Sequence, residues 1–162
     1  MRFARPFLAI FVVVLVGFAG LSARANPMLL VDMQTGEVLY DQEGGQPWHP
    51  ASLTKLMTAY VAFAAIAQGR IGLDTPITIS RNAWNQAPSK SGLEIDSAIT
   101  MQDALYILAV KSANDIAVAI AEAVSGSEKQ FVAEMNQMAQ AMGLSATHYV
   151  NPHGLHHKEQ VT

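Results

Sequence analysis

Residues 50–58 read Pro50-Ala51-Ser52-Leu53-Thr54-Lys55-Leu56-Met57-Thr58 and lead into a long helical pattern. From Ser52 to Gln68, apolar residues recur at the three- and four-residue spacing of a helix, and Gly69 follows as a stop signal. Very little polar surface interrupts this pattern. We therefore predict a helix over residues 52–68 that is buried on most sides and carries a hydroxyl and an amine on its first turn.

Shorter elements are predicted before this helix. Residues 29–33 and 37–40 are strand-like runs separated by Gln34-Thr35-Gly36. A glycine at the end of such a turn supplies the positive φ that a tight hairpin needs. We predict a β-hairpin over residues 29–40.

Further elements are predicted after the helix. Residues 70–99 are irregular, apart from a strand-like alternation over residues 75–79. One helix is expected to start at Thr100, a second to run over residues 113–124, and a third to start at Ser127 and end at Gly143. Thr100 pairs with Asp103 as a cap, and Ser127 begins a capping box. The expected inner face of the third helix comprises Phe131, Met135, Met138, Ala139 and Met142, with methionine as core filler.

Composition excludes several classes of protein. The 162 residues are 51% hydrophobic and 14% charged, with a formal net charge of −3 and no cysteine. Such values are typical of a globular domain, and they exclude coiled coils, collagen-like chains and disordered chains. An acidic chain without a basic cluster also argues against nucleic acid as a partner.

The N-terminus resembles a secretion signal. Arg2 and Arg5 precede an apolar run over residues 7–21, and Ala23-Arg24-Ala25 supplies small residues where a signal peptidase would cut. The run has 15 residues, fewer than the roughly 20 that a membrane span needs. We expect residues 1–25 to be cleaved, which changes the formal net charge to about −6. Residues 26–162 are then expected to be exported to the periplasm.

Ser52 and Lys55 could carry chemistry because they lie three residues apart, so both project from one helix face. A serine becomes a useful nucleophile when a neighbouring base takes its proton, and a lysine can be that base when burial lowers its pKa. By chance, about half of all chains of this length would contain S-x-x-K. The motif by itself therefore leaves open a capping serine and a solvated lysine.

A second polar element, Lys111-Ser112-Ala113-Asn114-Asp115, interrupts an otherwise apolar stretch. Unpaired polar groups are costly in a core, so these side chains either cap a helix or face a cleft. A similar S-x-N occurs at residues 80–82 without such a context. Lys90-Ser91-Gly92 matches K-[ST]-G by its letters, but its surroundings have the composition of a loop, and we interpret it as unrelated to catalysis.

Together these elements resemble a known family. The stretch 50–58, Ser112-Ala113-Asn114-Asp115, residues 131–136 and Asn151-Pro152-His153-Gly154-Leu155 occur in the order and spacing of the D-alanyl-D-alanine carboxypeptidases, which are low-molecular-mass penicillin-binding proteins. The similarity runs from about Pro27 to the end. It implies an α+β fold of the β-lactamase/transpeptidase type, in which an antiparallel sheet flanked by helices joins an all-helical lobe, with the active site between them.

The resemblance also implies roles for four residues. Ser52 would be the nucleophile that forms an acyl-enzyme, Lys55 its general base, Ser112 a proton relay, and Asn114 a ligand of the substrate amide. The substrate would be the pentapeptide stem of peptidoglycan, which loses its terminal D-alanine, and β-lactam antibiotics would acylate the same serine. No cofactor is implied. In this family a C-terminal segment often contacts the inner membrane.

The family's K-T-G element would follow Asn114 by roughly a hundred residues, beyond Thr162. We therefore interpret residues 26–162 as the N-terminal part of the catalytic domain, with the C-terminal strands of the sheet outside it. Two alternatives stay open: a class A-like β-lactamase, which expects S-D-N and a deacylating Glu, and a non-catalytic fragment that binds peptidoglycan. A metal site at His153, His156, His157 and Glu159 is disfavoured because the H-E-x-x-H pattern is missing.

Overall fold

A computed structural model describes residues 26–162, which are divided between two units, one ending at Gln46 and the other beginning at Pro47. The predicted signal segment, residues 1–25, lies outside the described residues. The first unit holds β1 (Met28–Val31) and β2 (Val38–Gln42). The second holds a 3-10 turn, η1 (Ala51–Leu53), followed by α2 (Thr54–Ala67), β3 (Pro76–Thr78), α3 (Arg81–Trp84), β4 (Ala98–Thr100), α4 (Met101–Lys111), α5 (Asn114–Ser125) and α6 (Glu128–Ala141).

The first unit is the predicted hairpin. Strands β1 and β2 pair antiparallel, with Leu30 opposite Tyr40. In the turn, the Asp32 carboxylate accepts hydrogen bonds from the main-chain N–H groups of Gln34 (2.9 Å) and Thr35 (2.8 Å). Gly36 has a φ of +74°, the left-handed conformation that the prediction required.

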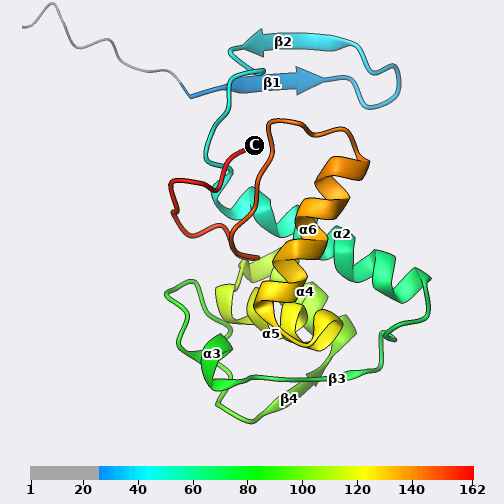
Figure 1. The fold of residues 1–162 in the computed structure, drawn as a ribbon, viewed down its shortest axis with the longest axis vertical. Coiled ribbons are helices and arrows are strands. Elements are labelled where there is room, and N and C mark those ends of the chain that lie inside the picture. The colour runs from blue at the N-terminus through cyan, green and yellow to red at the C-terminus, as the bar shows by residue number, and fades with distance from the viewer. Residues whose placement is uncertain (1–25) are drawn as a thin grey trace, which may run out of the picture. The chain divides into compact units, whose positions relative to one another are not determined.

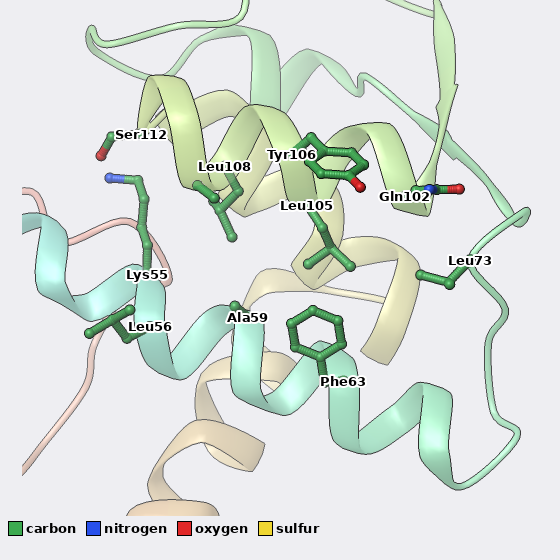
Figure 2. Close-up of a pocket in the computed structure, with 11 residues that line it drawn as sticks. Lys55, Leu56, Ala59, Phe63, Leu73, Gln102, Leu105, Tyr106, Leu108 and Ser112 are labelled. Atoms are coloured by element: carbon green, nitrogen blue, oxygen red, sulfur yellow. The ribbon is translucent and has the colours of Figure 1, made fainter. Parts of the chain in front are cut away.

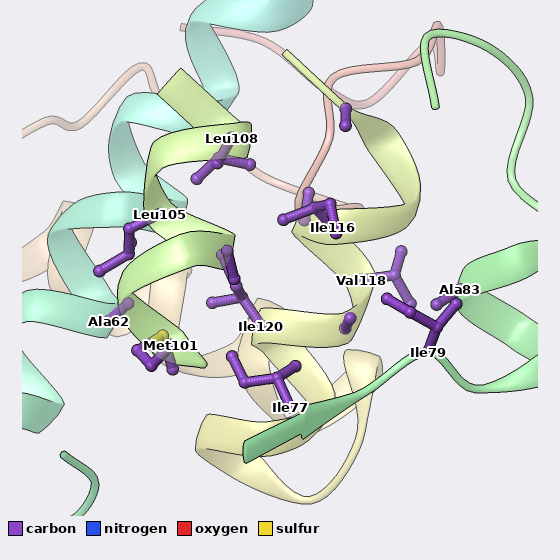
Figure 3. Packing of buried hydrophobic residues seen from close by; sticks show 14 residues of the cluster. Ala62, Ile77, Ile79, Ala83, Met101, Leu105, Leu108, Ile116, Val118 and Ile120 are labelled. Carbon is purple, nitrogen blue, oxygen red and sulfur yellow. The ribbon is translucent and has the colours of Figure 1, made fainter. Parts of the chain in front are cut away.

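The core of the second unit forms around α5. The residues of α5 from Asn114 to Ala121 are all buried, and this helix packs against α2, α3, α4, α6 and β3. Figure 3 shows Ile116, Val118 and Ile120 of α5 facing side chains from α2, α3, α4 and β3. Because residues 114–121 of α5 are buried among these neighbours, the helix fixes the positions of the helix ends that carry the candidate site residues (Figure 1).

The helix boundaries confirm most of the predicted signals. Thr100 Oγ1 accepts a hydrogen bond from the Asp103 N–H (3.1 Å), and Ser127 Oγ accepts one from the Gln130 N–H (3.2 Å). Gly126 ends α5 with a φ of +80°. Side-chain caps of this kind satisfy N–H groups that the first turn leaves unpaired.

Three details differ from prediction. Helix α2 is buried on one side only, because the opposite face exposes Leu56 (70%) and Phe63 (54%). Met142 lies just beyond α6 and is also exposed, unlike the rest of the predicted inner face. Residues 98–100 form a strand, β4, that pairs antiparallel with β3. Apolar spacing identifies a face that can be buried, but it does not indicate what covers that face.

None of the helices within residues 26–162 combines the length and the apolar character that crossing a membrane would demand.

Candidate active site

Ser52 and Lys55 meet where the 3-10 turn η1 becomes α2. Ser52 lies in the turn and is exposed to solvent, whereas Lys55, the second residue of α2, is 5% exposed. The Lys55 Nζ is 3.4 Å from the Ser52 Oγ. The structure therefore brings together the hydroxyl and the amine that the S-x-x-K spacing predicted to share a face.

A second oxygen holds the lysine. Lys55 Nζ donates a 2.7 Å hydrogen bond to the main-chain carbonyl of His153. Burial lowers the pKa of Lys55 from 10.5 to about 8. A minority of this amine is therefore neutral near pH 7, where almost none would be at a pKa of 10.5, and the neutral amine is the form that can accept a proton.

The turn that carries this carbonyl is held tightly against the start of α2. Asn151 Oδ1 accepts hydrogen bonds from the main-chain N–H groups of Gly154 (2.7 Å) and His153 (3.3 Å). Thr58 Oγ1 donates to the Pro152 carbonyl at 2.6 Å. Gly154 has a φ of +87°, and a Cβ there would lie 1.8 Å from the Ala51 carbonyl oxygen. Glycine is required at this position both by the left-handed conformation and by the close approach of the Ala51 backbone.

Ser112 and Asn114 come from the junction of α4 and α5. Ser112 ends α4 in a left-handed conformation with a φ of +53°. In Figure 2 its hydroxyl and the Lys55 amine point toward one another at one end of a cavity. Asn114 begins α5, and its main-chain N–H and Nδ2 donate to the carbonyls of Ser89 (2.7 Å) and Ala87 (2.9 Å).

Two cavities meet at Ser112. One, of about 450 Å³, is largely apolar and lies between α2 and α4, with Lys55 and Phe63 among its lining residues (Figure 2). The other, of about 400 Å³, is lined by Ser52 and Asn114 and by the turn over residues 153–157. All four predicted site residues therefore line one or both cavities, and an exposed hydroxyl, a buried amine and a second hydroxyl converge there. This arrangement is suited to acyl transfer.

Comparison with known proteins supports the same conclusion. The sequence profile of peptidase family S11, described as D-alanyl-D-alanine carboxypeptidase, matches residues 17–162. The chain belongs to this family. D-alanyl-D-alanine carboxypeptidase DacF from Bacillus subtilis is 36% identical over 135 residues, which cover 83% of this chain and 35% of that protein.

Solved structures of family members have the same fold. D-alanyl-D-alanine carboxypeptidase DacD from Francisella tularensis has a TM-score of 0.81 at 34% identity, covering 89% of this chain and 35% of that one. Penicillin binding protein 5 from Haemophilus influenzae has a TM-score of 0.79 at 35% identity, covering 85% and 41%. The predicted α+β fold of the transpeptidase type is confirmed. The chain spans about a third of the length of the curated relatives that it matches.

Within this family member, Lys90-Ser91-Gly92 lies in the loop between α3 and β4. Lys90 Nζ sits 4.3 Å from the centre of the Trp84 ring, and the Ser91 N–H and hydroxyl both donate to the buried Asp115 carboxylate. The Ser91 hydroxyl bond is 2.6 Å long. None of these three residues lines either cavity. Ser91 fastens the loop to α5, whereas Lys90 contacts Trp84 of α3.

The histidines of the C-terminal region have other partners. Burial, followed by the nearby Lys55 charge, lowers the pKa of His153 to about 4, so its ring is neutral at pH 7. His49 and His156 pack edge to face, with ring centroids 4.9 Å apart. Within residues 26–162, the structure gathers no three His, Asp or Glu side chains that could hold a metal ion.

The carbonyl of His153 is a site atom that the sequence does not reveal. The sequence pattern draws attention to the imidazole of His153, whereas the atom beside the lysine belongs to the main chain. The available signal was the Asn151-Pro152-His153-Gly154-Leu155 turn, because an asparagine three residues before a glycine is typical of a tightly hydrogen-bonded turn.

Proposed function

We propose that the full-length protein is a serine-type D-Ala-D-Ala carboxypeptidase that removes the terminal D-alanine from peptidoglycan pentapeptide stems. One observation carries this proposal: the buried Lys55 amine lies between the Ser52 hydroxyl and the His153 carbonyl. Membership of the carboxypeptidase family supports the reaction class and the substrate.

In the acylation step, Ser52 Oγ attacks the carbonyl carbon of the penultimate D-alanine while neutral Lys55 takes the hydroxyl proton. The tetrahedral intermediate collapses, the C–N bond breaks, and the leaving amine receives a proton from Lys55 through Ser112. Free D-alanine departs, and an ester remains on Ser52. Asn114 holds the substrate amide. Its position in the cavity that contains Ser52 supports this role.

In the deacylation step, a water molecule attacks the ester carbonyl and gives a proton to Lys55. The C–O bond to Ser52 breaks, the serine oxygen regains the proton, and the shortened stem leaves. The approach to Ser52 is open because this residue is exposed. β-Lactams contain an amide bond that mimics the scissile amide of the stem peptide, so we propose that they acylate Ser52. The relative named penicillin binding protein 5 supports this proposal.

Release of D-alanine tests the proposed activity. The full-length protein is incubated with two matched tripeptides that end in D-Ala-D-Ala or in L-Ala-L-Ala, and free alanine is measured. We expect release from the first peptide alone, and loss of that release in Ser52→Ala. Rapid penicillin turnover without alanine release would favour the β-lactamase alternative. Absence of both alanine release and penicillin binding would favour a non-catalytic role.

We also propose that the protein is exported to the periplasm with cleavage after Ala25. The basic start, the apolar run over residues 7–21 and the small residues at 23 and 25 support this. N-terminal sequencing of the protein from a cell-envelope fraction tests it. We expect a chain beginning at Asn26, and an intact Met1 would contradict cleavage.

A further inference from the structure

Gln160 carries a buried primary amide whose hydrogen bonds are all made within the protein. Gln160 is only 2% exposed. Its Oε1 accepts from the main-chain N–H groups of Val150 and Asn151, both at 3.0 Å. Its Nε2 donates to Thr54 Oγ1 (2.9 Å) and Asn151 Oδ1 (3.1 Å). Because an amide offers two donors and two acceptor sites, this side chain is saturated.

These bonds connect the two segments that hold the Lys55 amine. Thr54 is the first residue of α2 and the immediate neighbour of Lys55. Asn151 Oδ1, which Gln160 contacts, also accepts from the Gly154 N–H and so shapes the turn that presents the His153 carbonyl. Gln160 therefore ties the start of the lysine's helix to the turn that supplies the lysine's acceptor.

The main chain of Gln160 is itself fixed. Its carbonyl is 2.8 Å from His49 Nδ1, and its N–H donates to the His157 carbonyl at 3.0 Å. The adjacent Val161 pairs with His148 in an isolated antiparallel bridge. Main-chain contacts on either side of the Gln160 side chain therefore hold its amide in one place. A group that positions others has to be fixed in this way.

A glutamine suits this place better than other side chains of its size. Methionine would leave two main-chain N–H groups and a hydroxyl without their partner, and buried polar groups without partners are destabilising. Glutamate would keep the acceptors and lose both donors. The pattern calls for an acceptor toward residues 150–151 and a donor toward Thr54.

Building on the proposed function, we propose that Gln160 is a positioning residue for Lys55, acting through the turn over residues 151–154. The His153 carbonyl can only accept, so it engages an N–H of the lysine. In the neutral amine the remaining lone pair can then face Ser52 Oγ, 3.4 Å away. A displaced carbonyl would let the amine rotate and turn its lone pair away from the serine.

The test uses Gln160→Met in the full-length protein, with Gln140→Met as its control, because residue 140 is exposed on α6. We expect the rate constant of acylation by a fluorescent penicillin to fall about 10- to 100-fold in Gln160→Met, the range typical of a misplaced catalytic group. Reversible penicillin binding should change less than about twofold, since the substrate cavity keeps its other walls. Gln140→Met should match the unaltered protein in both.

A second pair of variants covers the case in which Gln160→Met fails to fold. Thr54→Val removes the hydroxyl that accepts a hydrogen bond from Gln160 Nε2, whereas Thr54→Ser retains this hydroxyl. Both substitutions conserve most of the side-chain volume at a position that is 1% exposed. We expect Thr54→Val to slow acylation severalfold and Thr54→Ser to restore the original rate within about twofold.

An NMR titration of Lys55 in protein labelled with ¹³C,¹⁵N-lysine provides a readout that does not depend on activity. Loosening the turn admits water, which raises the pKa of Lys55, and displaces the His153 carbonyl, which lowers it, so the titration midpoint should move away from its value in the unaltered protein. The ring of His153, whose pKa burial and the Lys55 charge lower to about 4, is neutral over the same pH range. A purely structural role would lower stability and leave the midpoint of the folded protein unchanged.

The proposal is overturned if folded Gln160→Met or Thr54→Val keeps both the original acylation rate and the original Lys55 midpoint. If penicillin does not acylate the unaltered protein, the proposed function is wrong. The NMR midpoints then still decide the positioning role, because they report the surroundings of the amine alone.

Discussion

Lys55 Nζ donates a 2.7 Å hydrogen bond to the main-chain carbonyl of His153, 98 residues further along the chain. The same amine lies 3.4 Å from Ser52 Oγ, which belongs to the preceding turn. A short-range and a long-range contact thus fix one atom.

Replacing Lys55 by arginine should nearly abolish acylation. Arginine keeps the positive charge but stays protonated at any usable pH, so it cannot take the serine proton. Loss of a general base typically slows a reaction by about 10² to 10⁴-fold. The rate of labelling by a fluorescent penicillin measures the effect, with Lys129→Arg as a control at an exposed position of α6. Unchanged labelling of Lys55→Arg would exclude Lys55 as the base.

Acylation should accelerate as the pH rises toward about 8 and level off above it. Burial lowers the pKa of Lys55 from 10.5 to about 8, so the amine is mostly protonated below that pH and mostly neutral above it. Only the neutral form accepts a proton. Labelling rates between pH 6 and pH 10 test this. A rate that falls with pH over this range would contradict a neutral-lysine mechanism.

The Gly154→Ala substitution should be strongly destabilising. The new Cβ would lie 1.8 Å from the Ala51 carbonyl oxygen, and the φ of +87° disfavours a side chain. Gly92→Ala is the matched control, because Gly92 has a φ of +92° with open space around it. We expect Gly92→Ala to cost about 1 kcal/mol of unfolding free energy, the cost of left-handed backbone alone, and Gly154→Ala to cost about 3 kcal/mol or more.

Equal urea unfolding curves for these two variants would mean that the close contact between Gly154 and Ala51 does not stabilise the turn. A stable Gly154→Ala protein with slow acylation would, in contrast, agree with a turn that moves and carries the His153 carbonyl with it.

Lys90→Ala should leave acylation unchanged within about twofold. Lys90 stacks over the Trp84 ring and lines neither cavity, although Lys90-Ser91-Gly92 matches a motif that catalysis uses in this family. An exposed cation–π contact contributes only about 0.5–1 kcal/mol, so stability should change little. Labelling by the fluorescent penicillin measures the activity. A large loss would show that this lysine serves the site.

Local signals made much of the fold predictable. The positive φ available to Gly36 predicts a turn, and the capping hydroxyls of Thr100 and Ser127 predict two helix starts. The structure has all three features at the predicted positions. The S-x-x-K spacing likewise places Ser52 and Lys55 one helical turn apart, since the geometry of a helix determines that distance.

Tertiary features were harder to foresee. The His153 carbonyl is a main-chain atom, and no side-chain pattern identifies which carbonyl will face a buried lysine. No local pattern distinguishes Gln160 from other glutamines, because only the folded chain brings its amide to Thr54, 106 residues earlier. The exposed face of α2 at Leu56 and Phe63 has the same apolar spacing as its buried face.

Peptide mapping of the full-length protein after reaction with penicillin tests whether Ser52 is the nucleophile. We expect one penicilloyl adduct, located on Ser52, and no adduct in Ser52→Ala. An adduct on another serine, or labelling that persists in Ser52→Ala, would contradict it.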